Sequence, residues 1–133
     1  MKKKHVILLT VFIVILVIVL AMTVISKKIE SNLDQLVVAT IPDIDLTKLD
    51  DGVYTGSYQV FPISVKVKVT LSNHTITEIV LVKHVNGQGK AAEVIIDKVV
   101  SAQSLDVDNI AGATYSSRVI LKAIENALNA TSD

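Results

Sequence analysis

The stretch ISVKVKVTL, residues 63–71, carries the clearest local pattern in the domain. Aliphatic residues alternate with polar ones along its whole length. Because successive side chains of a β-strand point to opposite faces, this alternation predicts a strand with one buried and one solvated face. We therefore expect the aliphatic side of this strand to face the core of a sheet.

Two further strands are predicted on either side of this stretch. Residues 53–60 include Tyr54 and Tyr58, and an interior Gly56 that indicates a bulge or a close approach of another backbone. Residues 72–74 have the composition of a turn, and the β-branched run 76–83 follows them. Short connections between three successive strands predict an antiparallel β-meander.

Two helices are predicted after the strands, over residues 90–102 and 115–128. Thr114 or Ser116 is a suitable N-cap for the second helix. Segregated strands and helices predict an α+β fold, with both helices packed on the apolar face of the meander. The apolar positions recur at helical spacing: Ala91, Val94, Ile95, Val99 and Ala102, then Val119, Ile120, Ala123, Ile124, Ala127 and Leu128.

The chain begins with a long apolar run, residues 6–25. A helix of this length spans about 30 Å, the thickness of the hydrocarbon core of a bilayer. A cleaved signal peptide usually has a shorter apolar region and a small-x-small cleavage site, so an uncleaved transmembrane helix is favoured. Three lysines precede the run and two follow it, which predicts a cytoplasmic N-terminus and an extracytoplasmic domain.

These patterns divide the chain into three parts. Residues 1–28 form the anchor, residues 29–50 an acidic linker interpreted as a solvated spacer, and residues 51–133 the domain. The net charge is zero and no basic cluster lies outside the flanks of the apolar run, which argues against nucleic acid as a partner. The chain has no cysteine, which excludes disulfides and cysteine-ligated clusters. Its three histidines are not at metal-site spacing.

The loop DNIAGATYSS, residues 108–117, leads directly into the last predicted helix. Gly112 permits a tight turn or a close approach to a ligand. The first N–H groups of a helix and its dipole suit an anion, phosphate above all. The alternative interpretation is only a turn followed by a well-capped helix.

The spelling Asp-x-x-Ala-Gly-Ala-Thr-x-Ser in this loop resembles the flavin-attachment motif of the FMN-binding domain family. That family includes the FMN-carrying C subunit of the sodium-pumping NADH:quinone reductase and the G subunit of the Rnf complex. The resemblance covers about residues 50–130 and is compatible with an α+β fold. It implies that Thr114 carries FMN through a phosphoester bond made by an FMN transferase. Ala111 departs from the usual Ser or Thr.

The resemblance also implies roles for the neighbours of Thr114. It assigns Asp108 to recognition by the transferase, whereas the residue type alone indicates a turn residue bonding to the backbone, and the two roles are compatible. A second loop, residues 86–90, occupies the position of a loop that helps to hold the flavin in larger family members, but its sequence differs from theirs. The predicted cofactor-binding set comprises Thr114, Asp108, Ala111, Gly112, Ala113, Tyr115, Ser116 and Ser117, together with Gly87, Gly89, Lys90 and His84. Tyr115, Tyr54, Tyr58 and His84 are candidate contacts of the flavin ring, or alternatively ordinary packing residues.

The predicted function is that of a membrane-anchored electron carrier with covalent FMN, rather than of an enzyme by itself. Thr114 has no His, Lys or Glu close in sequence, so it fits a substrate of the transferase better than a self-activated nucleophile. The expected partners are the FMN transferase, membrane redox proteins or the quinone pool, and the lipid bilayer. The alternative is a non-redox binding or regulatory module of the cell envelope, since fold and anchor alone do not discriminate between the two.

Overall fold

The computed structural model describes residues 1–85 and 89–130, and the chain forms two compact units. The first unit is Met1–Asn32 and the second is Leu33–Asp133. Helix α1, Lys2–Val38, begins in the first unit and ends in the second. The two units are described separately below.

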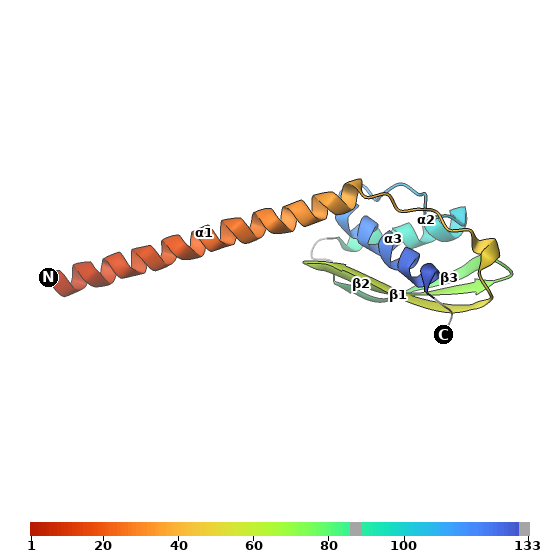
Figure 1. Ribbon diagram of the computed structural model, residues 1–133, viewed down its shortest axis with the longest axis horizontal. Coiled ribbons are helices and arrows are strands. Elements are labelled where there is room, and N and C mark those ends of the chain that lie inside the picture. The colour runs from red at the N-terminus through yellow and green to blue at the C-terminus, as the bar shows by residue number, and fades with distance from the viewer. Residues whose placement is uncertain (86–88, 131–133) are drawn as a thin grey trace. The chain divides into compact units, whose positions relative to one another are not determined.

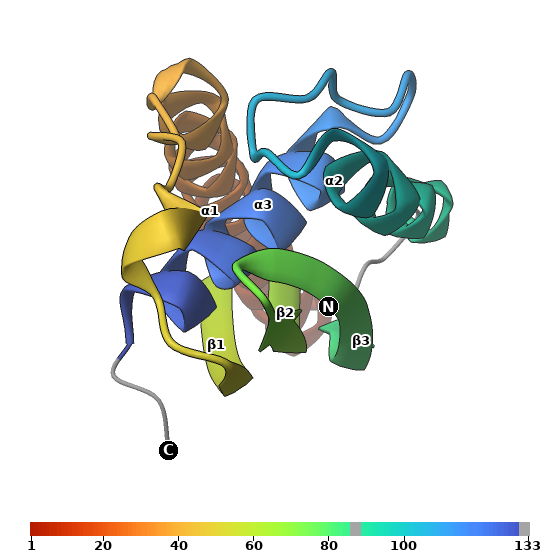
Figure 2. The same ribbon diagram turned by 90° about the vertical axis from the view of Figure 1, so that its right-hand side faces the viewer.

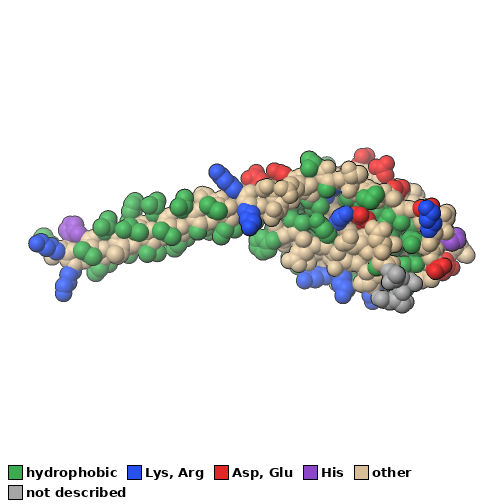
Figure 3. Space-filling view, viewed as in Figure 1, with side chains coloured by type: hydrophobic (Ala, Val, Ile, Leu, Met, Phe, Trp, Pro, Cys, Tyr) green, Lys and Arg blue, Asp and Glu red, His purple; other side chains and the backbone are tan. Residues whose placement is uncertain are grey.

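The first unit consists of the apolar part of α1. Large aliphatic side chains from Val6 to Ile25 are exposed, and the window that they occupy has a mean hydropathy of 3.3. Figure 3 shows hydrophobic side chains along this helix, with basic ones near its N-terminal end. By length and composition α1 can cross a membrane, and a signal sequence would meet the same criteria.

The second unit contains a three-stranded antiparallel sheet in the order β1-β2-β3. The strands are β1, Gly52–Val60, β2, Ile63–Ser72, and β3, Thr75–Val85 (Figure 1). Two-residue turns join them, and Asn73 and His74 in the second turn have positive φ angles. The predicted meander is therefore confirmed.

The central strand β2 has the two faces that its alternation predicts. Val65, Val67 and Val69 are at most 1% exposed, whereas Lys66 and Lys68 between them are exposed. Figure 3 shows basic side chains along the underside of the domain, on the side of the sheet away from the helices. The apolar face of the sheet is the one that α3 covers.

Two helices lie on that apolar face, as predicted for an α+β fold (Figure 2). They are α2, Ile95–Ala102, and α3, Thr114–Asn129. Short 3-10 helices also occur at η1, Leu46–Lys48, and η2, Lys90–Val94. Helix α3 contributes most of the core residues of this layer, and all six that the sequence predicts are buried: Val119, Ile120, Ala123, Ile124, Ala127 and Leu128.

The first predicted helix differs in its opening turn. Residues 90–94 form η2, and α-helical geometry begins only at Ile95. A 3-10 turn has three residues per turn instead of 3.6, which rotates the buried face. Ala92 is buried in place of the predicted Ala91, and Val94 is 53% exposed. The predicted core positions Ile95 and Val99 are correct, whereas the predicted Ala102, the last residue of α2, is exposed.

The acidic linker also differs from its interpretation as a solvated spacer. Leu33 and Leu36 are buried, and the carboxylate of Asp43 accepts hydrogen bonds from Ser104 and from the backbone of Leu105. Residues 33–43 therefore belong to the packed domain rather than to a free tether. The residue limits predicted for anchor, linker and domain otherwise remain predictions.

Candidate functional site

The N-terminus of α3 lies at the predicted attachment residue. Thr114 is the first residue of the helix, and Ala113 is its N-cap, with no side-chain hydrogen bond capping the helix. The prediction that Thr114 or Ser116 caps the helix is therefore wrong. Both residues already have helical positions, and the first hydrogen bond of the helix runs from Ser117 N–H to Ala113 O at 2.9 Å.

The turn that precedes the helix is held by Ser117. Its Oγ donates to Ala113 O at 2.8 Å and accepts from Ile110 N–H at 3.0 Å. Ala113 N–H closes the same turn on Ile110 O at 3.0 Å, and Gly112 between them has φ +75°. A positive φ of this size favours glycine, so Gly112 and Ser117 together define the path of the loop.

A cavity of about 240 Å³ opens beside this turn. Its walls come from the first residue of β2, from the residue before η2, and from the loop of residues 108–117, called here the attachment loop, which includes the start of α3. The fold thus brings together segments up to about 50 residues apart around Thr114. The lining residues are Ile63, Gly89, Gly112, Ala113, Thr114, Tyr115 and Ser116.

Two polar atoms of the loop are buried without a hydrogen-bond partner in the described part of the chain. They are Ser116 Oγ and Asn109 Oδ1, and Ser116 also lines the cavity. Buried polar groups nearly always have a partner, so each such atom needs an explanation. The uncapped start of α3 adds backbone N–H groups and the positive end of a helix dipole to the same place. The Ser116 hydroxyl and these N–H groups can donate to an anionic oxygen, whereas Asn109 Oδ1 is an amide oxygen and only accepts.

The other predicted loop residues lie around the cavity rather than in its wall. Asp108 and Ala111 are exposed, and the Asp108 carboxylate makes no hydrogen bond or ion pair within residues 1–85 and 89–130. The proposed turn bond of Asp108 is therefore absent there. Lys90 is also exposed, while Gly87 falls outside the described residues.

Of the four candidate ring contacts, Tyr115 is the one that lines the cavity. Tyr54 is 3% exposed, and its hydroxyl donates to Asp50 O at 2.7 Å, which assigns it to packing. Tyr58 lies across the strands from Val65 and does not line the cavity. The structure therefore separates the candidates that sequence reasoning left together.

His84, the fourth candidate, forms an ion pair or hydrogen bond with Glu93. Its side chain is only 3% exposed, and Nδ1 lies 2.9 Å from Glu93 Oε1. His84 is not among the residues that line the cavity. Its position suggests that it fastens the end of β3 to η2.

Sequence reasoning missed the residues that hold the attachment region from outside. Gln103 has a left-handed backbone, and its side-chain amide pairs with both N–H and C=O of Ile76 at 2.7 and 2.9 Å. This contact ties the segment that follows α2 to β3, because the amide bonds to the Ile76 backbone as the backbone of a neighbouring strand would. A polar residue after a helix is common, so nothing in the local sequence marks this role.

Asp43 bonds to the next two residues of this segment, Ser104 and Leu105. Its Oδ2 accepts from Ser104 Oγ at 2.8 Å and its Oδ1 from Leu105 N–H at 3.0 Å. Desolvation alone would raise the pKa of this carboxyl. The hydrogen bonds from Leu105, Ser104 and the N–H of Ile44 nevertheless hold the pKa of Asp43 below its ordinary value of 3.8.

The family profile of the FMN-binding domain matches residues 61–129, more than half of the chain. The chain belongs to the FMN-binding domain family. The matched range begins just before β2 and ends with α3, so it includes the whole cavity wall. The predicted recognition is therefore confirmed, and FMN is the cofactor that this membership supports.

An uncharacterized protein of Treponema pallidum (strain Nichols) is 33% identical over 84 residues. The alignment covers 61% of this chain and 23% of the relative, so the chain spans less than a quarter of that protein's length.

The residues around the cavity fit the phosphate end of FMN. Ser116 Oγ is a buried hydroxyl without a partner in the described segments, and α3 begins there without a side-chain cap. Apart from its chain neighbours, no atom of the described residues lies within 4 Å of a Cβ built at Gly112, so the space beside this residue is open. Thr114 itself is partly exposed.

Proposed function

We propose that this protein is a membrane-anchored flavoprotein that carries FMN covalently on Thr114 and acts as an electron carrier outside the cytoplasm. The observation that carries the proposal is the position of Thr114. It is the first residue of α3, it lines the cavity, and it stands in the loop that resembles the attachment motif.

Thr114 is best suited to be a substrate of an FMN transferase. It lines the cavity and remains partly exposed. No hydrogen bond or ion pair joins its hydroxyl to a base within the described residues, so removal of its proton falls to the transferase. The exposed carboxylate of Asp108, six residues upstream, is available for recognition by that enzyme.

The chain's own residues then bind and orient the cofactor. The start of α3 offers backbone N–H groups and the dipole to the phosphate, and Ser116 offers a hydroxyl. Gly112 leaves room for the ester, while Ile63 and Tyr115 supply the apolar and aromatic parts of the wall. When bound, the flavin supplies the electron-transfer chemistry, and the protein supplies attachment and position.

The site of action follows from the apolar part of α1. An uncleaved span with an N-terminal lysine cluster would hold the domain outside the cytoplasm, close to membrane redox proteins or the quinone pool. Protease added to intact protoplasts should then degrade residues 51–133. Protection of the domain while the membrane is sealed would refute this topology.

The attachment is tested by mass and fluorescence. Co-expressed with an FMN transferase and exported, the protein should gain the mass of one FMN less one water and fluoresce in a denaturing gel. Thr114→Val keeps the shape of the side chain but removes the hydroxyl, so the gain should disappear. Thr114→Ser retains a hydroxyl and should keep part of the label.

The same experiment separates the alternatives. Label that persists in Thr114→Val and maps to Ser116 or Ser117 would refute the assignment of the residue. No label on the wild-type chain under these conditions would favour a non-redox module of the cell envelope.

A further inference from the structure

The segment of residues 33–43, called here the linker strap, is bonded to residues 104 and 105 and to α3. Leu33 and Leu36 bury their side chains, and Asp43 binds the loop at Ser104 and Leu105. Contacts 61 and 62 residues apart in sequence therefore tie the strap to the segment that leads into the attachment loop. The strap is part of the surroundings of the flavin cavity.

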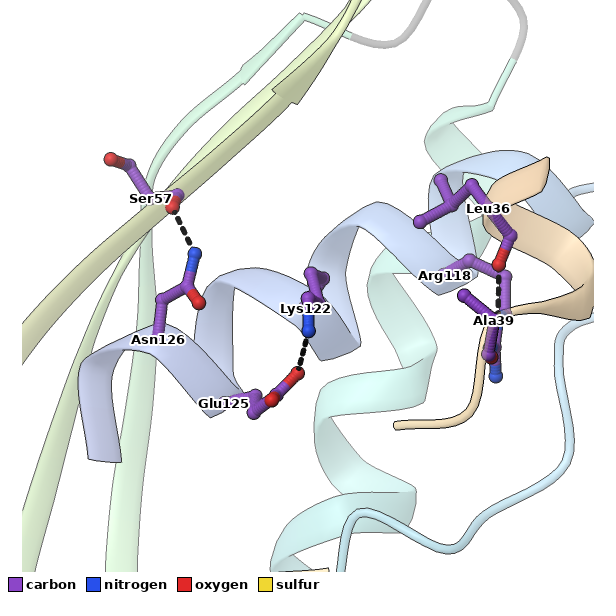
Figure 4. Close-up of polar contacts among 7 residues, drawn as sticks. All are labelled: Leu36, Ala39, Ser57, Arg118, Lys122, Glu125 and Asn126. Atoms are coloured by element: carbon purple, nitrogen blue, oxygen red, sulfur yellow. Dashed lines mark hydrogen bonds and ion pairs between the residues drawn. The ribbon is translucent and has the colours of Figure 1, made fainter. Parts of the chain in front are cut away.

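Arg118 provides the second attachment of the strap. Its guanidinium donates from Nε to Leu36 O at 3.3 Å and from Nη2 to Ala39 O (Figure 4). Both acceptors are backbone carbonyls near the C-terminal end of α1, whose last four carbonyls have no partner within the helix. Arg118 therefore caps α1 and holds the strap to α3 without involving any cavity residue.

Asp34 links the strap to the cavity wall. Its Oδ1 accepts a hydrogen bond from the hydroxyl of Tyr115 at 2.9 Å, across 81 residues of sequence. Tyr115 directly follows Thr114 and lines the cavity, with 36% of its surface exposed. The hydrogen bond at the tip of this ring favours the rotamer that keeps the hydroxyl at Asp34.

We propose that Asp34 is a positioning residue of the flavin site: it holds Tyr115 as the aromatic wall against which the flavin ring packs. The proposal rests on the proposed function, because the ring is brought to this wall by attachment at Thr114. Tyr115 is the ring candidate that lines the cavity, and Asp34 lies outside the cavity wall. An aromatic side chain packs well on a flat conjugated ring by offset stacking.

A merely structural role for Asp34 predicts different behaviour. If the contact only helped to fasten the strap, Asp34→Ala would lower stability and leave the flavin environment unchanged. The separate attachments at Arg118 and Asp43 should keep the strap in place when Asp34 is changed. The flavin signal can therefore be followed in a folded protein.

The test uses the full-length protein, loaded by an FMN transferase and purified in detergent, with loading verified by mass. A tyrosine ring packed on a flavin quenches its fluorescence by electron transfer, so quantum yield, lifetime and anisotropy report the contact. Loss of one hydrogen bond should lower the ratio of held to released ring conformers about fivefold. Asp34→Ala should therefore be brighter than the wild-type protein, with a longer mean lifetime.

Matched variants isolate the contact. Asp34→Asn keeps an oxygen acceptor and should restore the wild-type signal, and Gln35→Ala, an exposed neighbour, should leave the signal unchanged. Tyr115→Leu removes the ring and should give the brightest flavin. In a Tyr115→Phe background, Asp34→Ala should have no further effect, because the bond is already absent.

Three outcomes overturn the inference. A loaded Asp34→Ala protein with wild-type fluorescence would refute the positioning role while leaving attachment at Thr114 intact. Wild-type fluorescence in Tyr115→Leu would refute the assignment of Tyr115 as the wall. No mass gain in the wild-type chain would overturn the proposed function and this inference with it.

Discussion

Gly56 of β1 lies against the backbone of α3 at Ala127. A Cβ built at Gly56 would come 2.6 Å from Ala127 Cα and would overlap Ala123 O and Ala127 N. The contact is backbone on backbone, so no side chain can move away to make room. The interior glycine of β1 therefore marks the close approach of a helix, one of the two explanations that the sequence left open.

Gly56→Ala should destabilise the domain by about 1–3 kcal/mol, because α3 must shift as a whole to admit the methyl group. For a domain of this size, each kcal/mol corresponds to about 4–8 °C in Tm. Thermal unfolding monitored by circular dichroism measures the change. Ser57→Ala, on the next and exposed position, should stay within about 0.5 kcal/mol of the wild-type protein. Equal Tm values for the two variants would contradict the close packing.

Val67→Asp should unfold the domain, whereas Lys66→Asp should not. Val67 is 0% exposed at the centre of β2, and an unpaired carboxylate there costs several kcal/mol. That is a large share of the roughly 5–15 kcal/mol by which a domain is stable. Lys66 faces solvent on the other side of the strand and has no ion pair within the described residues. Similar unfolding curves for the two variants would show that the two faces of β2 are not distinct.

The parts of the fold that could be predicted are those in which apolar residues recur at the spacing of a strand or a helix. The alternation over residues 63–71 names the buried residues of β2, and the apolar spacing after Thr114 names those of α3. Both signals arise because one face of the element meets the core and the other meets water. Three strands joined by short turns left few other arrangements than a meander.

The parts that could not be predicted depend on contacts between distant residues. The bonds from Tyr115 to Asp34 and from Ser104 to Asp43 join segments 81 and 61 residues apart. Neither carboxylate has a neighbour that reveals such a partner, so an acidic linker was the simplest interpretation. The N-cap was predicted wrongly because Ser117, inside the helix, bonds back to Ala113 and leaves the start of the helix uncapped.

The loop that contains the site could be predicted from the sequence, but the cavity beside it could not. The motif identified Thr114 and its neighbours, whereas Ile63 entered the wall through the register of β2. The sequence does not distinguish the four candidate contacts of the flavin ring, because residue type alone does not say which of them faces the cavity. Burial and hydrogen bonding separated Tyr115 from Tyr54 and His84.

Ser117→Ala should lower stability more than Ser116→Ala. Ser117 is 0% exposed, and its Oγ bonds to both Ala113 O and Ile110 N–H, so its loss leaves Ile110 N–H without a partner at a cost of about 1–3 kcal/mol. Ser116 Oγ has no partner in the described residues, so its removal should cost less than about 1 kcal/mol. Chemical denaturation of the unloaded protein compares them. A larger loss in Ser116→Ala would mean that the two hydroxyls have been assigned to the wrong roles.

The fastening of the strap by Asp43 should depend on pH. Its pKa in the folded protein lies below the ordinary value of 3.8, since the bonds from Leu105, Ser104 and Ile44 outweigh the opposing effect of burial. A lowered pKa means that this stabilisation is complete above about pH 5 and is lost as pH falls through the folded-state pKa. Asp43→Asn should therefore have a lower Tm than the wild-type protein at pH 7, and the difference should shrink below about pH 4.

The matched control for this last comparison is Asp106→Asn. Asp106 is an exposed neighbour whose carboxylate takes no part in the bonds of Asp43, so its removal changes the same charge without loosening the strap. Its Tm should track that of the wild-type protein from pH 7 downward. A gap between Asp43→Asn and the wild-type protein that stays constant from pH 7 to pH 3 would contradict the prediction. The carboxylate charge of Asp43 would then contribute nothing to the contact between the strap and residues 104 and 105.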